Sequence, residues 1–329
     1  MSGTAPQILL QAEGLVQQYT TARSLFGKSS TVRAVDGIDL AVRKGEILGI
    51  VGESGSGKST LGRMLLGLEA PHEGRVLWQG RPMPAPRTPE WRASRAEMQM
   101  IFQDPLAALD RRMTISDQIA EPLQIHGTPP DQARARVAEL MARVGLRPDQ
   151  AGRYPHELSG GQRQRVVIAR ALATNPRFLV CDEPVSALDV SIQAQVVNLL
   201  RELQADQGLA MVFISHDLKV VRNICDRVAV MYLGRIVEEG PAERVFSDPR
   251  HPYTRALVSS VPRAGQGLSG RILLTGEPPN PAQRPSGCPF HPRCPAAIPA
   301  CARIQPELER HNGRRAACLR LDGALPDVA

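Results

Sequence analysis

Short apolar runs separated by polar, turn-forming residues recur along this chain of 329 residues. Residues 8–19 and 32–42 carry β-branched and apolar positions interrupted by Gly and Asp, a pattern typical of strands. Residues 46–51 are apolar after the first position and predict a buried central strand. Two more short apolar runs, at residues 178–181 and 211–214, predict further buried strands.

Other apolar residues recur at the spacing of one face of a helix. Such a face predicts a helix that packs on the rest of the protein, and a helix between the last two strands indicates a parallel sheet. The sequence therefore predicts an α/β fold. The two helical sets of apolar positions are Ala133, Val137, Leu140, Met141 and Val144, and then Ile192, Val196, Leu199, Leu200 and Leu203.

The composition changes at about residue 248, beyond which prolines become frequent. This change indicates an appended module that follows a loop-rich linker. No internal repeat is visible, so the predicted α/β unit occurs once.

The overall composition is that of an ordinary globular chain, with 42% hydrophobic and 22% charged residues. No run reaches the roughly 18 to 20 apolar residues that span a bilayer, and residues 1–6 lack the features of a signal peptide. We therefore expect a cytosolic chain that reaches a membrane only through a partner. The net charge of +7 lies mostly in residues 284–320, and with 4% aromatic residues it does not predict a nucleic-acid surface.

A phosphate-binding motif follows the predicted central strand. The segment from Gly52 to Ser59 reads Gly-Glu-Ser-Gly-Ser-Gly-Lys-Ser and fits G-x-x-x-x-G-K-[ST]. Its glycines let backbone N–H groups close around phosphate oxygens, and Lys58 and the Ser59 hydroxyl complete the site. P-loop kinases and GTPases carry the same motif, so it predicts nucleotide binding without choosing the class of protein.

Two further motifs narrow the class. The stretch from Leu158 to Gln162 reads Leu-Ser-Gly-Gly-Gln and precedes a helix predicted over residues 162–174, so this loop is a helix N-terminus that attracts phosphate. Asp182 and Glu183 end an apolar strand, where a carboxylate of a P-loop protein binds Mg²⁺.

Together these motifs resemble those of the ABC transporter ATPases, and the resemblance runs from about Leu9 to Ala317. It implies a P-loop NTPase cassette with a RecA-like core, an antiparallel β subdomain and a helical insert. We expect the cassette at residues 8–247, with its helical subdomain at about 104–174. A small Cys-rich C-terminal module is expected at residues 248–329.

The resemblance implies a complete ATP site. In this family the lysine of the motif, here Lys58, lies on the β- and γ-phosphates, Ser59 binds Mg²⁺ and Thr60 lies near the α-phosphate. Tyr19 is the expected adenine stacker, because the family has an aromatic residue at the end of its first strand. The other loop residues expected to bind ATP are Gly52, Ser54, Gly55 and Gly57.

The resemblance also implies which groups hydrolyse ATP. Asp182 binds Mg²⁺ directly or through water, and Glu183 polarises the attacking water. Gln103 matches a glutamine that reaches Mg²⁺ or the water and carries motion to the helical insert. His216 matches a histidine near the γ-phosphate. Because all these residues follow the family consensus, we expect this subunit to hydrolyse ATP rather than only bind it.

A second ATPase subunit is implied as well, because the family's signature motif contacts the γ-phosphate of an ATP held by a partner. Asp189 matches the loop that links the two ATP sites across the dimer. The signature residues expected to contact the partner's ATP are Ser159, Gly160, Gly161 and Gln162.

Several longer runs resemble the dipeptide and oligopeptide importer ATPases, most of all the second of their two ATPase subunits. The runs cover residues 52–63, 154–156, 183–190, 232–237 and 250–254. This resemblance implies a paralogous ATPase in a head-to-tail dimer, two membrane permeases and an extracytoplasmic peptide-binding protein. The chain would then lie on the cytoplasmic face of the membrane as a peripheral subunit.

The cargo stays open between dipeptides, longer peptides and related solutes such as nickel chelates. Soluble ABC ATPases of DNA repair or translation form another class. Their long coiled-coil or zinc inserts, or a second cassette, are not found in this sequence. Exporter cassettes usually lack such a C-terminal tail.

Four of the six cysteines lie in the C-terminal segment, and they are Cys288, Cys294, Cys301 and Cys318. Structural disulfides are disfavoured in a cytosolic protein, so a shared metal is the better interpretation. The spacing does not choose the metal. The resemblance favours a [4Fe-4S] cluster over Zn²⁺ or unligated thiols, with a structural or partner-docking role. Cys181 and Cys225 are expected in the core.

Overall fold

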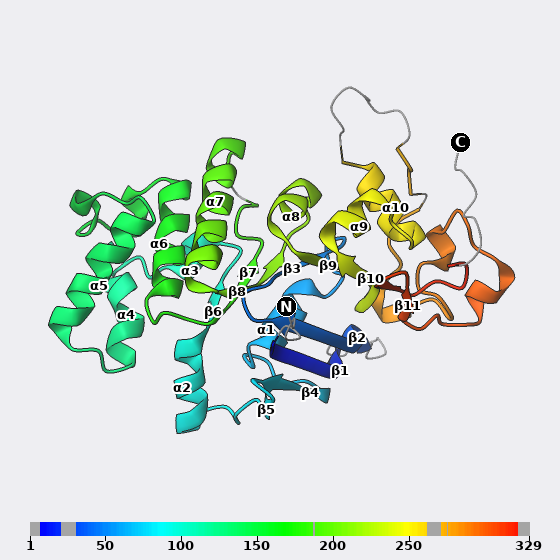
Figure 1. Ribbon diagram of the computed structural model, residues 1–329, viewed down its shortest axis with the longest axis horizontal. Helices are drawn as coiled ribbons and strands as arrows, with labels where there is room; N and C mark the ends of the chain where they lie inside the picture. Colours follow the sequence, from blue (N-terminus) through cyan, green and yellow to red (C-terminus); the bar gives the residue numbers. More distant parts are fainter. Residues whose placement is uncertain (1–6, 21–30, 187, 262–270, 275, 322–329) are drawn as a thin grey trace, which may run out of the picture. The chain divides into compact units, whose positions relative to one another are not determined.

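The computed structural model describes residues 7–20, 31–186, 188–261, 271–274 and 276–321 (Figure 1). The predictions made on residues 1–6 and on parts of the C-terminal module lie outside the described residues, as does Ala187 of the loop before Asp189. The described chain divides into two compact units. The first comprises Met1–Leu10, Val42–Ile47 and Leu77–Ile214, and the second comprises Gln11–Ala41, Leu48–Val76 and Ser215–Ala329.

Parallel strands in the order β8-β7-β6 form the centre of the first unit. Phe178–Asp182 (β7) is buried at every residue and pairs with Met98–Ile101 (β6) and Ala210–Ile214 (β8). The long helix Val190–Gln207 (α7) connects β7 to β8. The predicted order of strand, helix and parallel strand is therefore confirmed. The buried face of α7 consists of Val196, Val197, Leu199, Leu200 and Leu203.

Helices fill the stretch in which the helical insert was predicted, and α4 and α5 pack side by side with α6 (Figure 1). Helix α5 begins with a proline, which has no N–H, and this costs no hydrogen bond because N–H groups of the first helical turn have no partner within the helix. The helix buries the predicted apolar face. The bounds are Pro105–Ala108 (α3), Ile115–Ile125 (α4), Pro130–Arg143 (α5) and Gly160–Leu172 (α6), with Pro89–Glu97 (α2) before β6. Two 3₁₀ turns lie at Pro148–Gln150 and Pro155–Glu157.

Strands in the order β11-β12-β10-β9-β3 run through the second unit. Ile47–Val51 (β3), which leads into the phosphate motif, lies parallel to Arg227–Tyr232 (β9). Arg235–Pro241 (β10) pairs antiparallel with β9. From the C-terminal segment, Arg314–Ala316 (β12) pairs with β10, and Glu309–His311 (β11) pairs with β12. The sequence did not predict these last two strands.

A separate four-stranded sheet has the order β2-β1-β4-β5. Its first two members confirm the N-terminal strands predicted from β-branched and apolar positions interrupted by Gly and Asp, and β4 and β5 form an antiparallel pair. The bounds are Ile8–Thr20 (β1), Thr31–Arg43 (β2), Glu73–Trp78 (β4) and Arg81–Pro82 (β5).

The helices of the second unit are short. The described ones are Lys58–Leu65 (α1), Leu218–Ile224 (α8), Ala242–Ser247 (α9) and Pro252–Ser259 (α10), with 3₁₀ turns at Pro281–Gln283, His291–Arg293 and Pro299–Ala302. None of the helices described in either unit is long and apolar enough to cross a membrane.

A buried ion-pair group ties β2 to β10 and to the C-terminal segment. The carboxylate of Asp36, which is 4% exposed, accepts from Nε of Arg235 at 2.6 Å and also pairs with Arg284. Arg284 donates in addition to the carbonyl of Leu233. Burial acts to raise the pKa of Asp36, but the charges of Arg235 and Arg284 outweigh this effect and hold the pKa below its usual value.

Candidate nucleotide site

The phosphate motif forms a tight loop between β3 and α1. Gly52 has a φ of 152° and Gly57 a φ of 99°, which are strained for residues with a side chain. A Cβ atom on Gly52 would lie 2.2 Å from the carbonyl oxygen of Met231, and one on Gly57 would lie 1.9 Å from that of Ala34. Only glycine fits at both positions, as the motif requires.

Lys58, the first residue of α1, is buried and folds back over this loop. Its Nζ donates to the carbonyl oxygens of Gly52 at 2.8 Å and Glu53 at 2.9 Å. The positive charge therefore lies within the loop whose backbone surrounds it. The start of α1 adds the partial positive charge of a helix N-terminus, and this combination favours phosphate.

Tyr19 lies at the end of β1 and is 39% exposed. Its hydroxyl bonds the carboxylate of Glu69 and lies 3.5 Å from Oγ1 of Thr60. Arg63 also contacts Glu69, at 3.1 Å. The ring is thus tethered near the beginning of α1, and its predicted role as an adenine stacker stays a prediction.

The first unit brings Gln103 and Glu183 together, because β6 and β7 run parallel with Ile101 opposite Cys181. Nε2 of Gln103 donates to Oε2 of Glu183 at 3.1 Å. Asp182, the last residue of β7, is only 6% exposed. The two carboxylates therefore follow a buried strand, with the glutamine beside the second one.

Glu183 has a φ of 47°, a left-handed conformation that is rare for residues with a side chain. Its N–H donates to the carbonyl oxygen of Ile214 at 2.9 Å, which fixes the turn after β7. Such a conformation costs roughly 1–2 kcal/mol and tends to persist where function requires it.

His216 lies exposed in the short turn between β8 and α8. Its neighbours hold the turn in place. Asp217 caps α8 by accepting from the N–H of Lys219 at 2.8 Å, and the N–H of Ser215 donates to the carbonyl of Ile50 at 3.2 Å.

The signature residues form the N-terminus of α6, which begins two residues earlier than the sequence predicted. Ser159 and Gln162 form a capping box: Oγ of Ser159 accepts from the N–H of Gln162 at 3.3 Å, and Oε1 of Gln162 accepts from the N–H of Ser159 at 3.0 Å. A Cβ atom on Gly161 would lie 2.8 Å from Ile192 of α7, so close packing also requires this glycine. Asp189 is the exposed N-cap residue of α7.

The predicted residues divide between the two units. The second unit holds the phosphate loop, Tyr19 and His216, whereas the first holds Gln103, Asp182, Glu183, the signature residues and Asp189. Sequence reasoning missed Glu53 and Arg293 in the second unit, although Glu53 occupies a variable position of the motif and Arg293 precedes one of the singled-out cysteines.

The six cysteines are all free, and Cys181 and Cys225 are buried as expected. Within the described ranges no three His, Cys, Asp or Glu side chains form a metal-binding group. Burial raises the pKa values of Cys288, Cys294 and Cys318, that of Cys294 to about 11. The charges of neighbouring cysteine thiolates would raise these pKa values further.

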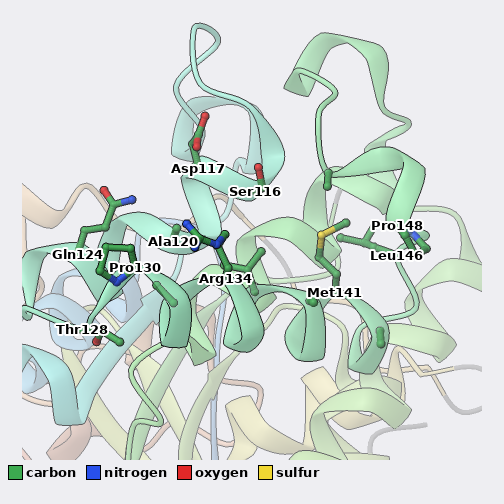
Figure 2. A pocket seen from close by; sticks show the side chains of 15 residues that line it. Ser116, Asp117, Ala120, Gln124, Thr128, Pro130, Arg134, Met141, Leu146 and Pro148 are labelled. Atoms are coloured by element: carbon green, nitrogen blue, oxygen red, sulfur yellow. The ribbon is translucent and has the colours of Figure 1, made fainter.

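A largely apolar pocket of about 620 Å³ lies in the helical region of the first unit (Figure 2). Side chains from α4 and α5, such as Ala120 and Met141, face it together with Leu146. None of the predicted ATP-site residues lines this pocket.

Solved structures of ATP-binding cassettes share this fold. The ATP-binding cassette MJ0796, in a dimeric post-hydrolysis state bound to ADP and Pi, is 27% identical with a TM-score of 0.64, over 71% of this chain and 98% of that one. The protein cbiO1 from Clostridium perfringens, part of the transporter complex cbiONQ, is 30% identical with a TM-score of 0.63, over 74% and 92%. Fold and motifs together define an ABC-type ATPase.

The relatives narrow this class. Residues 35–186 match the family "ABC transporter", and residues 237–301 match "Oligopeptide/dipeptide transporter, C-terminal region". The oligopeptide transport ATP-binding protein OppF of Escherichia coli (strain K12) is 52% identical over 297 residues, 89% of each chain. The putative oligopeptide transport ATP-binding protein YkfD of Bacillus subtilis (strain 168) is 52% identical over 89% of this chain and 91% of its own. The chain therefore belongs to the ATP-binding subunits of oligopeptide and dipeptide ABC transporters.

Proposed function

We propose that this chain binds and hydrolyses ATP to power the import of dipeptides or oligopeptides across the cytoplasmic membrane. The match of residues 237–301 to the C-terminal region of oligopeptide/dipeptide transporters carries the proposal. An ABC cassette of another transport class would account only for the match at residues 35–186. We assign the cassette to residues 8–247 and the importer-type extension to residues 248–329.

In the proposed mechanism Lys58 and the loop N–H groups bind the ATP phosphates. Ser59 and Asp182 would hold Mg²⁺, and a hydroxyl with a buried carboxylate is the oxygen donor set that this ion prefers. The ion supplies positive charge to the phosphates. Glu183 orients and polarises the attacking water, while Gln103 holds the glutamate through their 3.1 Å hydrogen bond.

The remaining assigned residues act around this centre. His216 contacts the γ-phosphate, and Tyr19 stacks on adenine. Residues 159–162 contact an ATP held by a paralogous ATPase, since a helix N-terminus with a capping box favours the γ-phosphate. Asp189 couples the two ATP sites.

The partners follow from the same family. We propose a head-to-tail dimer with a paralogous ATPase beneath two membrane permeases, fed by an extracytoplasmic peptide-binding protein. The chain then works as a peripheral subunit at the cytoplasmic face, and nucleic acid has no part in the function. The transported peptide never touches this chain.

Uptake of labelled peptides tests the function. A strain deleted for this gene should lose uptake of a dipeptide, a tripeptide or a pentapeptide, and the wild-type gene should restore it, whereas Glu183→Gln should not. Nickel uptake with a chelator, measured in the same strains, identifies the alternative cargo. Undiminished uptake of all the peptides after deletion would refute peptide import.

We also propose that the C-terminal thiols of residues 288, 294, 301 and 318 hold a [4Fe-4S] cluster. Burial raises the pKa values of Cys288, Cys294 and Cys318, while backbone N–H groups of Phe290, Ala296 and Arg320 act in the opposite direction and favour the thiolate form that binds iron. Because burial disfavours the thiolates of Cys288, Cys294 and Cys318, a bound metal would be needed to deprotonate these three at neutral pH. The cluster would supply a structural cross-link for a small module.

Metal analysis tests this second proposal. Anaerobically purified protein should be brown and contain iron and acid-labile sulfide, and Cys294→Ser should remove the colour while ATP still binds. A colourless protein that contains stoichiometric zinc would show that these thiols bind zinc and not an iron–sulfur cluster. Protein with neither metal would reject the site.

A further inference from the structure

Glu53, a variable position of the phosphate motif, contacts Lys58 of the loop through one group and the C-terminal segment through two others. Its carbonyl oxygen accepts from Nζ of Lys58 at 2.9 Å. Its N–H donates to the hydroxyl of Tyr253 at 2.9 Å. Its carboxylate forms an ion pair with Arg293. All four residues belong to the second unit.

The ion pair between Glu53 and Arg293 is bidentate. Nη1 of Arg293 lies 2.8 Å from Oε2 of Glu53, and Nη2 lies 3.1 Å from Oε1. The arginine side chain is only 7% exposed, and Nη1 also lies 3.4 Å from the hydroxyl of Tyr232. The Glu53 side chain is 27% exposed, but its two-pronged, charge-assisted contact with a buried arginine fixes both the position and the orientation of the carboxylate.

Aromatic packing holds the other contact in place. Tyr253, the second residue of α10, is fully buried, and its ring centroid lies 4.6 Å from that of Tyr232 and 5.4 Å from that of Phe290. His251 caps α10, since its Nδ1 accepts from the N–H of Tyr253 at 3.1 Å. The hydroxyl of Tyr253, which accepts from the N–H of Glu53, is therefore held in position by packed aromatic rings and a capped helix.

We propose that Arg293 and Tyr253 are positioning residues for ATP binding, which hold the phosphate loop through Glu53 in the conformation that receives phosphate. The C-terminal extension is then part of the nucleotide site. This inference rests on the proposed function, namely that residues 52–59 bind the ATP phosphates.

The physical reason is preorganisation. A phosphate loop works because its N–H groups converge before the ligand arrives, and a loop that must first be ordered binds more weakly. Arg293 binds the carboxylate of Glu53, and Tyr253 binds its N–H. Without these two contacts, the carbonyl oxygen of Glu53, to which Lys58 donates, would no longer be held in a fixed position.

Nucleotide affinity of the purified full-length chain tests the proposal, with Mg²⁺–AMPPNP as the probe in isothermal titration. Arg293→Gln and Glu53→Gln should each raise Kd by about 10- to 100-fold, the range expected for hydrogen bonds to charged groups. The double variant should bind no more weakly than the weaker single variant, because both changes remove one interaction. Arg293→Lys should recover only part of the affinity, since lysine lacks the fork.

Arg315→Gln is the matched control. Arg315, in the same C-terminal segment as Arg293, pairs with the buried Glu239 of β10 and donates to the carbonyl oxygen of Asp39, and neither partner belongs to the phosphate loop. It should lower stability while Kd stays within about twofold of wild type, the scatter expected for independent sites. An equal rise in Kd for Arg315→Gln and Arg293→Gln would show general destabilisation and overturn the proposal.

Two further variants keep the test decisive. Lys58→Ala should abolish binding of the probe, and normal binding by this variant would refute the proposed function. If Lys58→Ala does not bind the probe but Arg293→Gln binds it normally, only the present inference is refuted. If Arg293→Gln does not fold, Tyr253→Phe decides, because it keeps the ring and removes only the hydroxyl. We expect it to raise Kd about five- to tenfold, and an unchanged Kd would contradict the positioning role.

Discussion

Glu183 combines a left-handed backbone conformation with a side chain held by Gln103. A glutamate has no intrinsic preference for this conformation, so the surrounding contacts must impose it, among them the bond from its N–H to Ile214. The apolar run before Asp182 predicted where these carboxylates would lie. It could not predict the backbone strain, which arises only when β7 and β8 pair.

Glu183→Gln should leave ATP bound and slow its hydrolysis by about 10²- to 10⁴-fold, because the amide cannot polarise water as a carboxylate does. The shape of the side chain is kept, so the contact with Gln103 survives. Phosphate release and nucleotide occupancy should be measured together in the assembled transporter. Turnover at the wild-type rate would remove Glu183 from the catalytic residues.

Gly57→Ala should destabilise the nucleotide-free chain by more than Gly55→Ala does. Both glycines have positive φ values, 99° and 76°, so each variant carries roughly 1–2 kcal/mol of backbone strain. Only at Gly57 would the new methyl group meet the carbonyl oxygen of Ala34, whereas nothing lies within 4 Å at Gly55. Urea unfolding of both variants checks this order, and equal losses would contradict the steric argument.

Strands and helices agree closely with the sequence-based expectations where one local pattern decides the outcome. The buried run at residues 46–51 forms β3 over Ile47–Val51, and the apolar face predicted around Val137 is the buried face of α5. Strands β11 and β12 were missed because three-residue, charged strands carry no alternating pattern. Contacts such as Glu53 with Arg293 join residues 240 positions apart, and no local signal encodes them.

Asp36→Asn should destabilise the chain by about 3 kcal/mol at pH 7, since it leaves Arg235 and Arg284 without their shared carboxylate. Asp39→Asn, an exposed change on the same strand, should cost well under about 1 kcal/mol and serves as the control. Chemical unfolding gives both values. A loss at Asp36 no larger than that at Asp39 would show that the ion-pair group contributes nothing.

The pH dependence of this difference has a defined sign. The folded-state pKa of Asp36 is lowered from its usual value of 3.8, so the ion pairs stabilise the folded state above that pH. As the pH falls through the folded-state pKa, the carboxylate takes up a proton and the stabilisation disappears. Wild type and Asp36→Asn should therefore converge in stability in acid, and a constant gap would contradict the assignment.

For the complete protein, dimerisation should control turnover. The signature residues begin α6 after the helical insert, whereas the phosphate loop precedes that insert, and we propose that each ATP needs one motif from each of two subunits. The dilute chain alone should hydrolyse ATP about 10²-fold more slowly than the full transporter, the loss typical of missing transition-state donors. Mass and phosphate release measured on one sample check this, and full turnover by a monomer would refute it.

The pairing of β12 with β10 also affects the tendency of this protein to self-associate. An uncovered β10 would offer a row of backbone donors and acceptors to any other strand, including those of a second molecule. The sheet ends instead at β11, which is three residues long and carries Glu309, Arg310 and His311. Short charged margins of this kind discourage intermolecular β-pairing. The short, charged β11 therefore makes this edge of the sheet a poor template for a strand of a second molecule.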